Sequence, residues 1–335
     1  MTKLADDWAG FKETAAADQQ AKRLDLAGVV VSESELDALD IPKRKPLLGD
    51  WFFEGDLGFV TAKRGVGKTW LGLHMARALA DGSECGPWKA HTAVKVLYID
   101  GEMPLDEMRD RNAELRTKGP TENVFVLSHQ LVFDRQERNL CLSDPECQEA
   151  LTQICAERGI RVVFIDNQST LITRVRENSA DDWRDLIEGW LLGFRRRGIA
   201  VVVINHAGRN GEMRGTSKRE DPAFWSIMLE AVEGTGDGAE FGSRFTKNRN
   251  AVKDPAQLRW HFCPSGDGVT VTYAELDPID ALVEWVREGF SHCSEIAEVM
   301  GISKGQVSKL AKKAEKAGKL KIVGRLYKLT DDDEG

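Results

Sequence analysis

One stretch decides the fold, and it reads Val60-Thr61-Ala62-Lys63-Arg64-Gly65-Val66-Gly67-Lys68-Thr69. The apolar run Leu57–Val60 comes before it and predicts a buried strand. The segment after it carries Leu71, Met75 and Leu79 at helical spacing until Asp81-Gly82 ends the helix. A glycine-rich loop between a strand and a helix turns its backbone N–H groups inward and binds phosphate oxygens. The stretch therefore predicts a phosphate-binding loop in an α/β domain.

The loop and its next residue are the expected nucleotide contacts. Lys68 is expected to reach the β- and γ-phosphates of ATP, and Thr69 to place its hydroxyl on Mg²⁺. Alanine stands where the first glycine of the motif is usual, but Gly65 and Gly67 still permit the tight turn. The expected contact residues are Ala62, Lys63, Arg64, Gly65, Val66, Gly67, Lys68, Thr69 and Trp70.

Acidic residues follow two further apolar runs. Glu102 follows the run 94–100, and Asp166 ends the run 160–166. Parallel strands place ligands at their carboxyl ends, so Asp166 is expected to hold Mg²⁺ through its water shell. Because Asn167 and not a second acid follows Asp166, we assign to Glu102 the carboxylate that activates water. The alternative is that Glu102 only caps the helix near Pro104.

A third apolar run, 199–204, ends in Asn205-His206. A polar residue at the end of a strand beside the phosphate-binding loop can contact the γ-phosphate and transmit its presence to the next loop. His206 is the predicted sensor, and a purely structural histidine is the alternative.

In this order, the phosphate-binding loop, Glu102, Asp166, His206 and the segment Arg214-Gly215-Thr216-Ser217 resemble the RecA-type ATPases. The chain is most similar to the hexameric replicative helicases of plasmids and phages, the RepA-like and DnaB-like group, over roughly residues 45 to 275. The resemblance implies a RecA-like core with a mainly parallel sheet. It also implies a homo-oligomeric, hexameric ring with nucleotide between subunits and single-stranded DNA in the centre.

That family also supplies a cation to the neighbouring subunit's nucleotide. Lys247 and Arg249, in the segment 243–250, resemble its paired basic residues. Alternate residues of a strand share one face, so both cations are expected to project together. The alternative is a solvated basic strand.

Two regions are predicted to contact DNA through the phosphate backbone. The first is a glycine-rich loop with the cations Arg209, Arg214, Lys218 and Arg219; a lid over the nucleotide would look the same.

The second is a C-terminal module that reads as helix, glycine turn and helix, followed by a hairpin, which predicts a small winged helix-turn-helix domain suited to duplex DNA. Its expected contacts are Lys304, Lys309, Lys312, Lys313 and Arg325. Protein contact is the alternative role of this module.

The predicted organisation is an N-terminal arm (1–44), the ATPase domain (45–277), the winged helix (278–330) and an acidic tail (331–335). In the arm, residues 29–31 are read as a short strand or a docking segment. The net charge of −8 conceals an acidic core and a basic C-terminal module. The six cysteines contain no C-x-x-C pair, so no zinc site is expected. No apolar run is long enough for a membrane span and no signal core is seen, so we expect a cytoplasmic protein.

These patterns, together with the resemblance, predict a Mg²⁺-dependent ATPase and DNA helicase in which hydrolysis drives translocation on single-stranded DNA. The resemblance implies that it acts in plasmid, phage or mobile-element replication. The main alternative is a DNA-binding ATPase switch, a regulator or loader that assembles on DNA without unwinding it. A strand-exchange recombinase, which would form filaments, is a third reading.

Overall fold

The computed structural model describes residues 26–173, 183–207, 221–232, 236–251, 255–266, 268–300 and 302–330. The chain divides into two compact units, Met1–Lys43 and Arg44–Gly335. The cations expected in the glycine-rich loop, Arg209, Arg214, Lys218 and Arg219, lie outside the described residues, and so does the acidic tail at 331–335.

In the N-terminal unit the described residues hold one short helix, α2 (Glu33–Ala38). Ser32 caps its first turn, and the Glu35 carboxylate accepts a hydrogen bond from the Ser32 N–H at 2.7 Å. The expectation of a strand at 29–31 is wrong, because the Val29 N–H closes a local turn onto the Leu26 carbonyl at 3.2 Å. The alternative reading of a docking segment stays a prediction.

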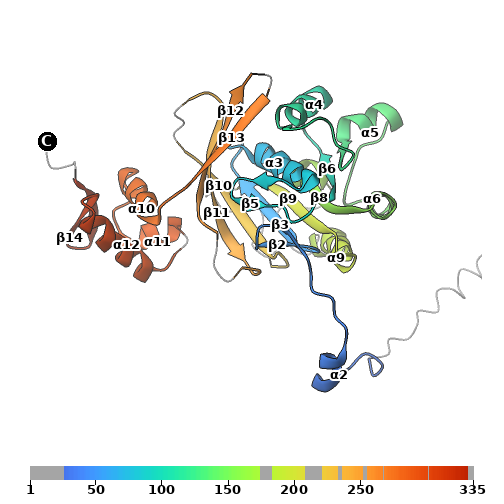
Figure 1. Ribbon diagram of the computed structural model, residues 1–335, viewed down its shortest axis with the longest axis horizontal. Helices are drawn as coiled ribbons and strands as arrows, with labels where there is room; N and C mark the ends of the chain where they lie inside the picture. Colours follow the sequence, from blue (N-terminus) through green and yellow to red (C-terminus); the bar gives the residue numbers. More distant parts are fainter. Residues whose placement is uncertain are drawn as a thin grey trace, which may run out of the picture. The chain divides into compact units, whose positions relative to one another are not determined.

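The second unit is built on a nine-stranded sheet with the order β13-β12-β11-β10-β3-β9-β8-β6-β7 (Figure 1). From β10 to β7 the strands run parallel, and β11, β12 and β13 continue antiparallel. The bounds are β3 (Leu57–Ala62), β6 (Lys95–Asp100), β7 (Val124–Ser128), β8 (Ile160–Asp166), β9 (Ala200–His206), β10 (Trp225–Ala231), β11 (Ala239–Asn248), β12 (Leu258–Ser265) and β13 (Gly268–Glu275). The α/β fold with a mainly parallel sheet is confirmed.

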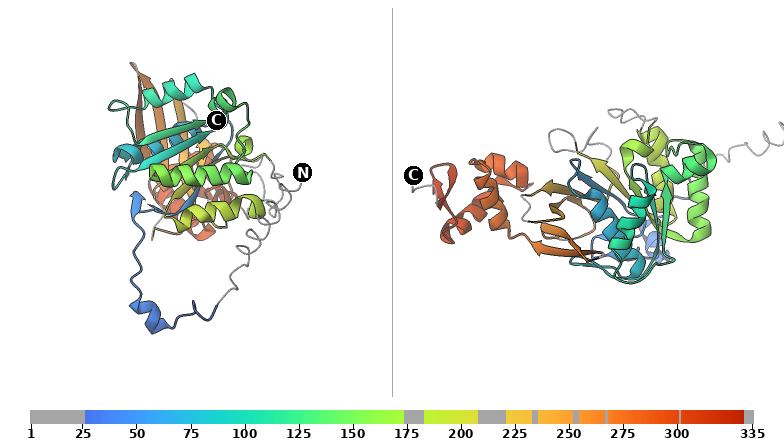
Figure 2. Two further views of the ribbon diagram at one scale, coloured as in Figure 1. Left: turned by 90° about the vertical axis from the view of Figure 1, so that its right-hand side faces the viewer. Right: turned by 90° about the horizontal axis from the view of Figure 1, so that it is seen from above.

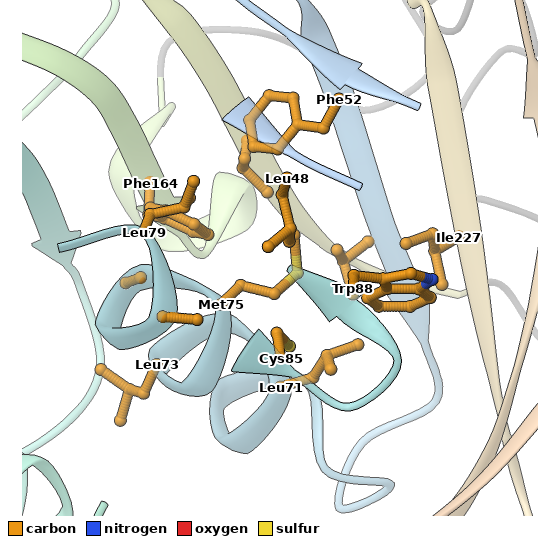
Figure 3. Close-up of a cluster of buried hydrophobic side chains, with 14 of the residues drawn as sticks. Leu48, Phe52, Leu71, Leu73, Met75, Leu79, Cys85, Trp88, Phe164 and Ile227 are labelled. Carbon is orange, nitrogen blue, oxygen red and sulfur yellow. The ribbon is translucent and has the colours of Figure 1, made fainter. Parts of the chain in front are cut away.

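Apolar side chains alternate along the parallel strands and bury both faces of the sheet. Val60 and Phe164 pack with helix α3 on one face, whereas Phe59 and Ile165 pack with α6 and α9 on the other. Figure 3 shows Leu71, Met75 and Leu79 of α3 within the first cluster. The helices of the domain are α3 (Lys68–Asp81), α4 (Leu105–Glu114), α5 (His129–Gln136), α6 (Pro145–Arg158), α7 (Gln168–Leu171), the π-helix η1 (Arg184–Glu188) and α9 (Gly189–Arg196).

Helices α6 and α9 lie side by side beneath the sheet (Figure 2), where the Trp190 indole N–H donates to the Thr152 hydroxyl at 3.2 Å. The segment before β3 forms two short strands that are not part of the large sheet. They belong to a separate pair, β1 (Pro46–Leu48) and β2 (Phe52–Phe53), beside a second pair, β4 (Glu84–Cys85) and β5 (Trp88–Lys89). Trp51 anchors this region by edge contacts with Trp88 and Trp225.

The C-terminal segment has its own apolar core, in which Leu282, Ile296 and Val307 are fully buried. Its elements are α10 (Pro278–Arg287), α11 (Cys293–Met300), α12 (Lys304–Lys316), β14 (Leu320–Val323) and β15 (Leu326–Leu329). Ser303 and Gln306 form a capping box at the start of α12. Among the described residues, no helix is long and apolar enough to cross a membrane.

Candidate nucleotide-binding site

The loop between β3 and α3 has the backbone geometry that phosphate binding requires. Gly65 and Gly67 have φ values of +79° and +118°, which side chains rarely adopt. A Cβ on Gly67 would also lie 2.4 Å from the Phe241 ring. Position 67 therefore requires glycine both because of its backbone angle and because the Phe241 ring occupies the space of a Cβ. Lys68 begins the helix, so the loop residues and the positive helix end face the same point.

Strand register brings the polar ends of four parallel strands into one row. Ala62 pairs with His206, and Asp100 pairs with Asp166 on one side and Ser128 on the other. Asp100, Ser128 and Asp166 are buried. Such a row of buried polar groups at the carboxyl edge, beside the phosphate-binding loop, is the usual ligand-binding arrangement of an open α/β sheet.

Asp166 is the buried carboxylate that ends β8. Burial raises the pKa of Asp166, against the hydrogen bonds from Tyr98 and Thr69 and the charge of Lys68, which lower it. The Tyr98 hydroxyl donates to Asp166 Oδ2 at 2.7 Å. A buried carboxylate next to a threonine hydroxyl is a hard-oxygen pair of the kind Mg²⁺ prefers, so Thr69 and Asp166 fit the ion. Among the described residues no cluster of three His, Cys, Asp or Glu side chains forms, and Mg²⁺ in such sites is completed by phosphate and water.

The Lys68 side chain extends back along the loop. Its ammonium donates to the carbonyl oxygens of Ala62 at 3.2 Å and Lys63 at 2.9 Å. Burial lowers the pKa of Lys68, while the charges of Asp166 and Glu102 oppose that shift. A cation held in a desolvated pocket between carbonyls and acids is positioned to exchange those carbonyls for phosphate oxygens.

Glu102, which follows β6, and His206, which ends β9, have their side chains close together at this edge of the sheet. The His206 Nε2 lies 3.9 Å from Glu102 Oε1 and 3.2 Å from the Asn167 side-chain amide nitrogen. The Glu102 side chain is 48% exposed, whereas that of His206 is 9% exposed. Glu102 is thus open to water and nucleotide, and His206 links it to the strand that carries Asp166.

Asp100 is a residue that the sequence analysis did not single out. Burial raises the pKa of Asp100 to about 7, with the charge of Asp166 adding to the shift and a hydrogen bond from Met103 opposing it. Its Oδ2 accepts the Met103 N–H at 2.9 Å, which closes the turn carrying Glu102. The signal was present in the sequence, because Asp100 ends its strand just as Asp166 does.

Trp70, near the start of α3, lines a cavity of about 490 Å³. The other walls come from Glu114, from Gly238 and Ala239 at the start of β11, and from β12, β13 and the turn between them, and the Arg111 guanidinium lies 5.3 Å from the centre of the Trp70 ring. The space is bounded by an aromatic ring, a carboxylate and exposed backbone, which suits a flat heterocycle.

Lys247 and Arg249 lie at the opposite edge of the sheet. Asn248 pairs with Trp225, and Trp225 pairs with Gly58, at the amino ends of the parallel strands. Both cations donate to one acceptor, the Asp221 carbonyl, at 3.1 Å and 3.0 Å. They therefore project together, and away from the phosphate-binding loop of their own subunit.

Beside these cations a buried carboxylate, Asp56, makes stability depend on pH. Burial raises the pKa of Asp56 to about 6, against hydrogen bonds from Phe53, Arg44 and Asn250 that lower it. Because the folded pKa lies above the ordinary 3.8, the stabilising effect of the protonated group is complete below about pH 4 and is lost as pH rises through 6.

We expect the free energy of unfolding to fall by ~3 kcal/mol across that window through Asp56. Asp56→Asn should flatten this part of the profile in urea unfolding measured from pH 4 to 7. The matched control is Asp50→Asn, since Asp50 is exposed. Parallel profiles for wild type and Asp56→Asn would contradict the assignment.

The basic residues expected to contact DNA in the C-terminal module are exposed. Lys309, Lys312 and Lys313 lie on α12 opposite the buried Val307, Ala311 and Ala314, Lys304 is the first residue of that helix, and Arg325 lies in the turn between β14 and β15.

The glycine-shaped loop at the start of α3, the buried acids beside it and the mainly parallel sheet define a RecA-like P-loop ATPase. A family model described as an AAA domain matches residues 19–212, and the chain belongs to this family.

Two relatives are similar over 204 residues, which is 61% of this chain: the DNA repair protein RadA of Salmonella typhimurium at 26% identity and that of Escherichia coli at 25%. The chain spans only 38% of the length of each relative. Among solved structures, a KaiC-like protein from Pyrococcus horikoshii OT3 aligns with 66% of this chain and 90% of its own, at 14% identity and a TM-score of 0.45.

Proposed function

We propose that the chain is a Mg²⁺-dependent ATPase that assembles as a ring, hexameric by resemblance, and couples ATP hydrolysis to movement along single-stranded DNA. One observation carries the proposal. The candidate hydrolytic residues gather at the carboxyl edge of the sheet, while Lys247 and Arg249 converge at the opposite edge. Cations at that far edge of one subunit can reach the nucleotide of a neighbouring subunit in a ring.

In the proposed reaction, Lys68 binds the β- and γ-phosphates and the loop N–H groups hold the remaining oxygens. Glu102 accepts a proton from water as that water attacks the γ-phosphorus, and the bond to the ADP oxygen breaks. Thr69 and Asp166 would hold Mg²⁺, which would supply positive charge against the phosphates. His206 contacts Glu102 and senses whether the γ-phosphate is present.

The nucleotide base is assigned to the cavity beside Trp70. Trp70 follows Lys68 by two residues on the first turn of α3, so a nucleotide whose phosphates occupy the loop has its base within reach of that ring. Stacking on the aromatic face and the nearby Glu114 carboxylate account for binding of a purine.

Assembly is supported by the N-terminal unit. Its described residues expose a run of large apolar side chains, each at least 45% accessible: Leu26, Val29, Val30, Val31, Leu36, Leu39 and Ile41. Apolar surface of this kind is stabilised when it is covered by a partner. A second copy of the chain is the partner that a ring provides.

DNA as the partner rests on two observations. The similar curated proteins are named DNA repair proteins. In addition, α12 carries five exposed lysines, of which Lys309, Lys312, Lys313 and Lys316 share one side of the helix. We assign this segment to a winged helix that contacts duplex phosphates, and the loop at 208–220 to single-stranded DNA.

The deciding experiment measures the ATPase rate with and without single-stranded DNA and images the particles in the same samples. A severalfold stimulation together with closed rings is expected. Slow turnover that single-stranded DNA leaves unchanged would contradict translocation.

The C-terminal module favours a second candidate function, an ATPase switch that assembles on duplex DNA without unwinding it. Strand displacement separates the two functions. A forked duplex that is separated only with hydrolysable ATP supports the helicase, whereas ATP-dependent duplex binding without separation supports the switch.

A further inference from the structure

The cations Lys247 and Arg249 sit beside a polar cluster that the proposed reaction does not yet use. The cluster consists of Arg44, Asp56 and Asn250, and it joins residues that are far apart in the sequence. Asn250 of this cluster directly follows Arg249 in the chain, so the cluster can affect where the Arg249 side chain lies.

Asn250 is the centre of the cluster, and each part of its amide has a partner. Its Nδ2 donates to Asp56 Oδ2 at 2.6 Å and to the Trp51 carbonyl at 2.8 Å. Its Oδ1 accepts from Arg44 at 3.0 Å. A side-chain amide with both donors and its acceptor satisfied is fixed in orientation, and it fixes the backbone that carries it.

Asp56 makes the cluster rigid because it is buried. It is 1% exposed, and it accepts from Arg44, from the Phe53 N–H at 2.8 Å and from Asn250. A buried carboxylate without hydrogen-bond donors would strongly destabilise the fold. Moving any of the three donors away from Asp56 therefore costs free energy, and this keeps them in place.

The strand that carries the cations is irregular at the same place. In the pairing of β10 with β11, Ser226 faces Lys247 and Ile227 faces Phe245, so Thr246 is an extra residue. A bulge bends a strand and re-aims the side chains next to it. The bulge lies before Lys247 and Asn250 lies after Arg249, so the segment with both cations is held at its two ends.

The aromatic ring of Phe224 ties the cluster to Arg249 a second time. The Arg44 guanidinium lies 4.5 Å from the centre of that ring, and the Arg249 N–H donates to the Phe224 carbonyl at 2.8 Å. Arg44 therefore supports the backbone of Arg249 through both Asn250 and Phe224.

We propose that Asn250 is a positioning residue for the trans-acting cations: held by Asp56 and Arg44, it aims Lys247 and Arg249 at the neighbouring subunit's nucleotide. This inference rests on the proposed trans-acting role of Arg249. Asn250 itself does not touch the nucleotide, and it acts by fixing the direction in which Arg249 leaves the strand.

The test measures kcat and KM for ATP of the full-length protein with single-stranded DNA. Asn250→Ala should lower kcat by about 10- to 100-fold, because misplacement by about 1 Å has effects of this size, and should leave KM within about twofold. Arg249→Ala should lower kcat by about 10³-fold or more. The double variant Arg249→Ala/Asn250→Ala should be no slower than Arg249→Ala alone, because without the Arg249 side chain the positioning effect of Asn250 is already lost.

A matched control is Glu230→Gln, which removes the Glu230–Arg244 ion pair of 2.8 Å from the same two strands but leaves the cluster intact. It should keep the wild-type kcat. Arg44→Lys provides a second route should Asn250→Ala fold poorly, because a lysine retains the charge but cannot reach Asp56 and Asn250 with one planar fork. It should also lower kcat at unchanged KM.

Mixed assemblies distinguish positioning from a general structural role. Asn250→Ala subunits retain an intact nucleotide site, and Glu102→Gln subunits retain intact cations, so mixtures should regain turnover that neither variant has alone. A wild-type kcat for Asn250→Ala, with Arg249→Ala slow, would overturn the positioning role alone. A wild-type kcat for Arg249→Ala would overturn the trans-acting cation itself.

Discussion

Replacing Lys68 by alanine is expected to abolish ATP hydrolysis, with a loss of about 10³-fold or more in turnover. The ammonium is the cation at the floor of the phosphate-binding loop, 2.9 Å from the Lys63 carbonyl and under the influence of Asp166 and Glu102. Without it, the phosphates lose the buried cation of this loop, which compensates the negative charge that develops on them. Phosphate release with saturating ATP is the measurement.

The fold should survive the Lys68 replacement. Because burial lowers the pKa of Lys68, the folded protein holds its charge at a cost, and alanine removes that cost. The thermal midpoint is therefore expected to change by only a few °C. Lys95→Ala is the matched control, since it removes an exposed lysine at the start of β6 that is not among the expected nucleotide contacts. Retained turnover in Lys68→Ala would remove the loop from the reaction.

Glu102→Gln is expected to lower turnover by about 10²- to 10⁴-fold while ATP binding is kept. Glutamine has the shape of glutamate but cannot accept the proton of the attacking water. Glu102 is the half-exposed acid of the row, so water reaches it, and its contact with His206 at 3.9 Å holds it near the strand ends. Binding of a fluorescent ATP analogue and single-turnover hydrolysis separate the two effects.

Two comparison variants make the result for Glu102 specific. Asp106→Asn changes an exposed acid in the first turn of α4 and should leave turnover at the wild-type value. Asp100→Asn changes the buried neighbour that closes the turn carrying Glu102. If Glu102→Gln hydrolyses ATP normally and Asp100→Asn does not, the base is Asp100, and the assignment to Glu102 is wrong.

Local pattern was sufficient for the elements of the core. The expected strand before the loop appears as β3, the expected helix as α3, and the runs that end at Asp166 and His206 as β8 and β9. Alternating apolar runs and glycine at forced backbone angles are properties of neighbouring residues. These properties do not depend on how the rest of the chain packs, so they can be recognised in the sequence.

Local pattern predicted the wrong element where the structure depends on pairing with another part of the chain. Residues 29–31 have the composition of a strand, but a strand needs a neighbour for its backbone groups, and the local turn at Val29 provides for them instead.

The phosphate-binding loop, the α/β core and the acids that end its strands can all be recognised from the amino-acid sequence. The three-dimensional fold was needed to show that Asp100 lies against Asp166, that His206 lies near Glu102, and that Lys247 and Arg249 lie at the far edge with Asn250 and Asp56. The cause is strand order. β6 and β8 are neighbours although β7 lies between them in the chain, and β10 joins β3 from the other side. Long-range pairing of this kind depends on how the whole sheet packs, and no local periodicity encodes it.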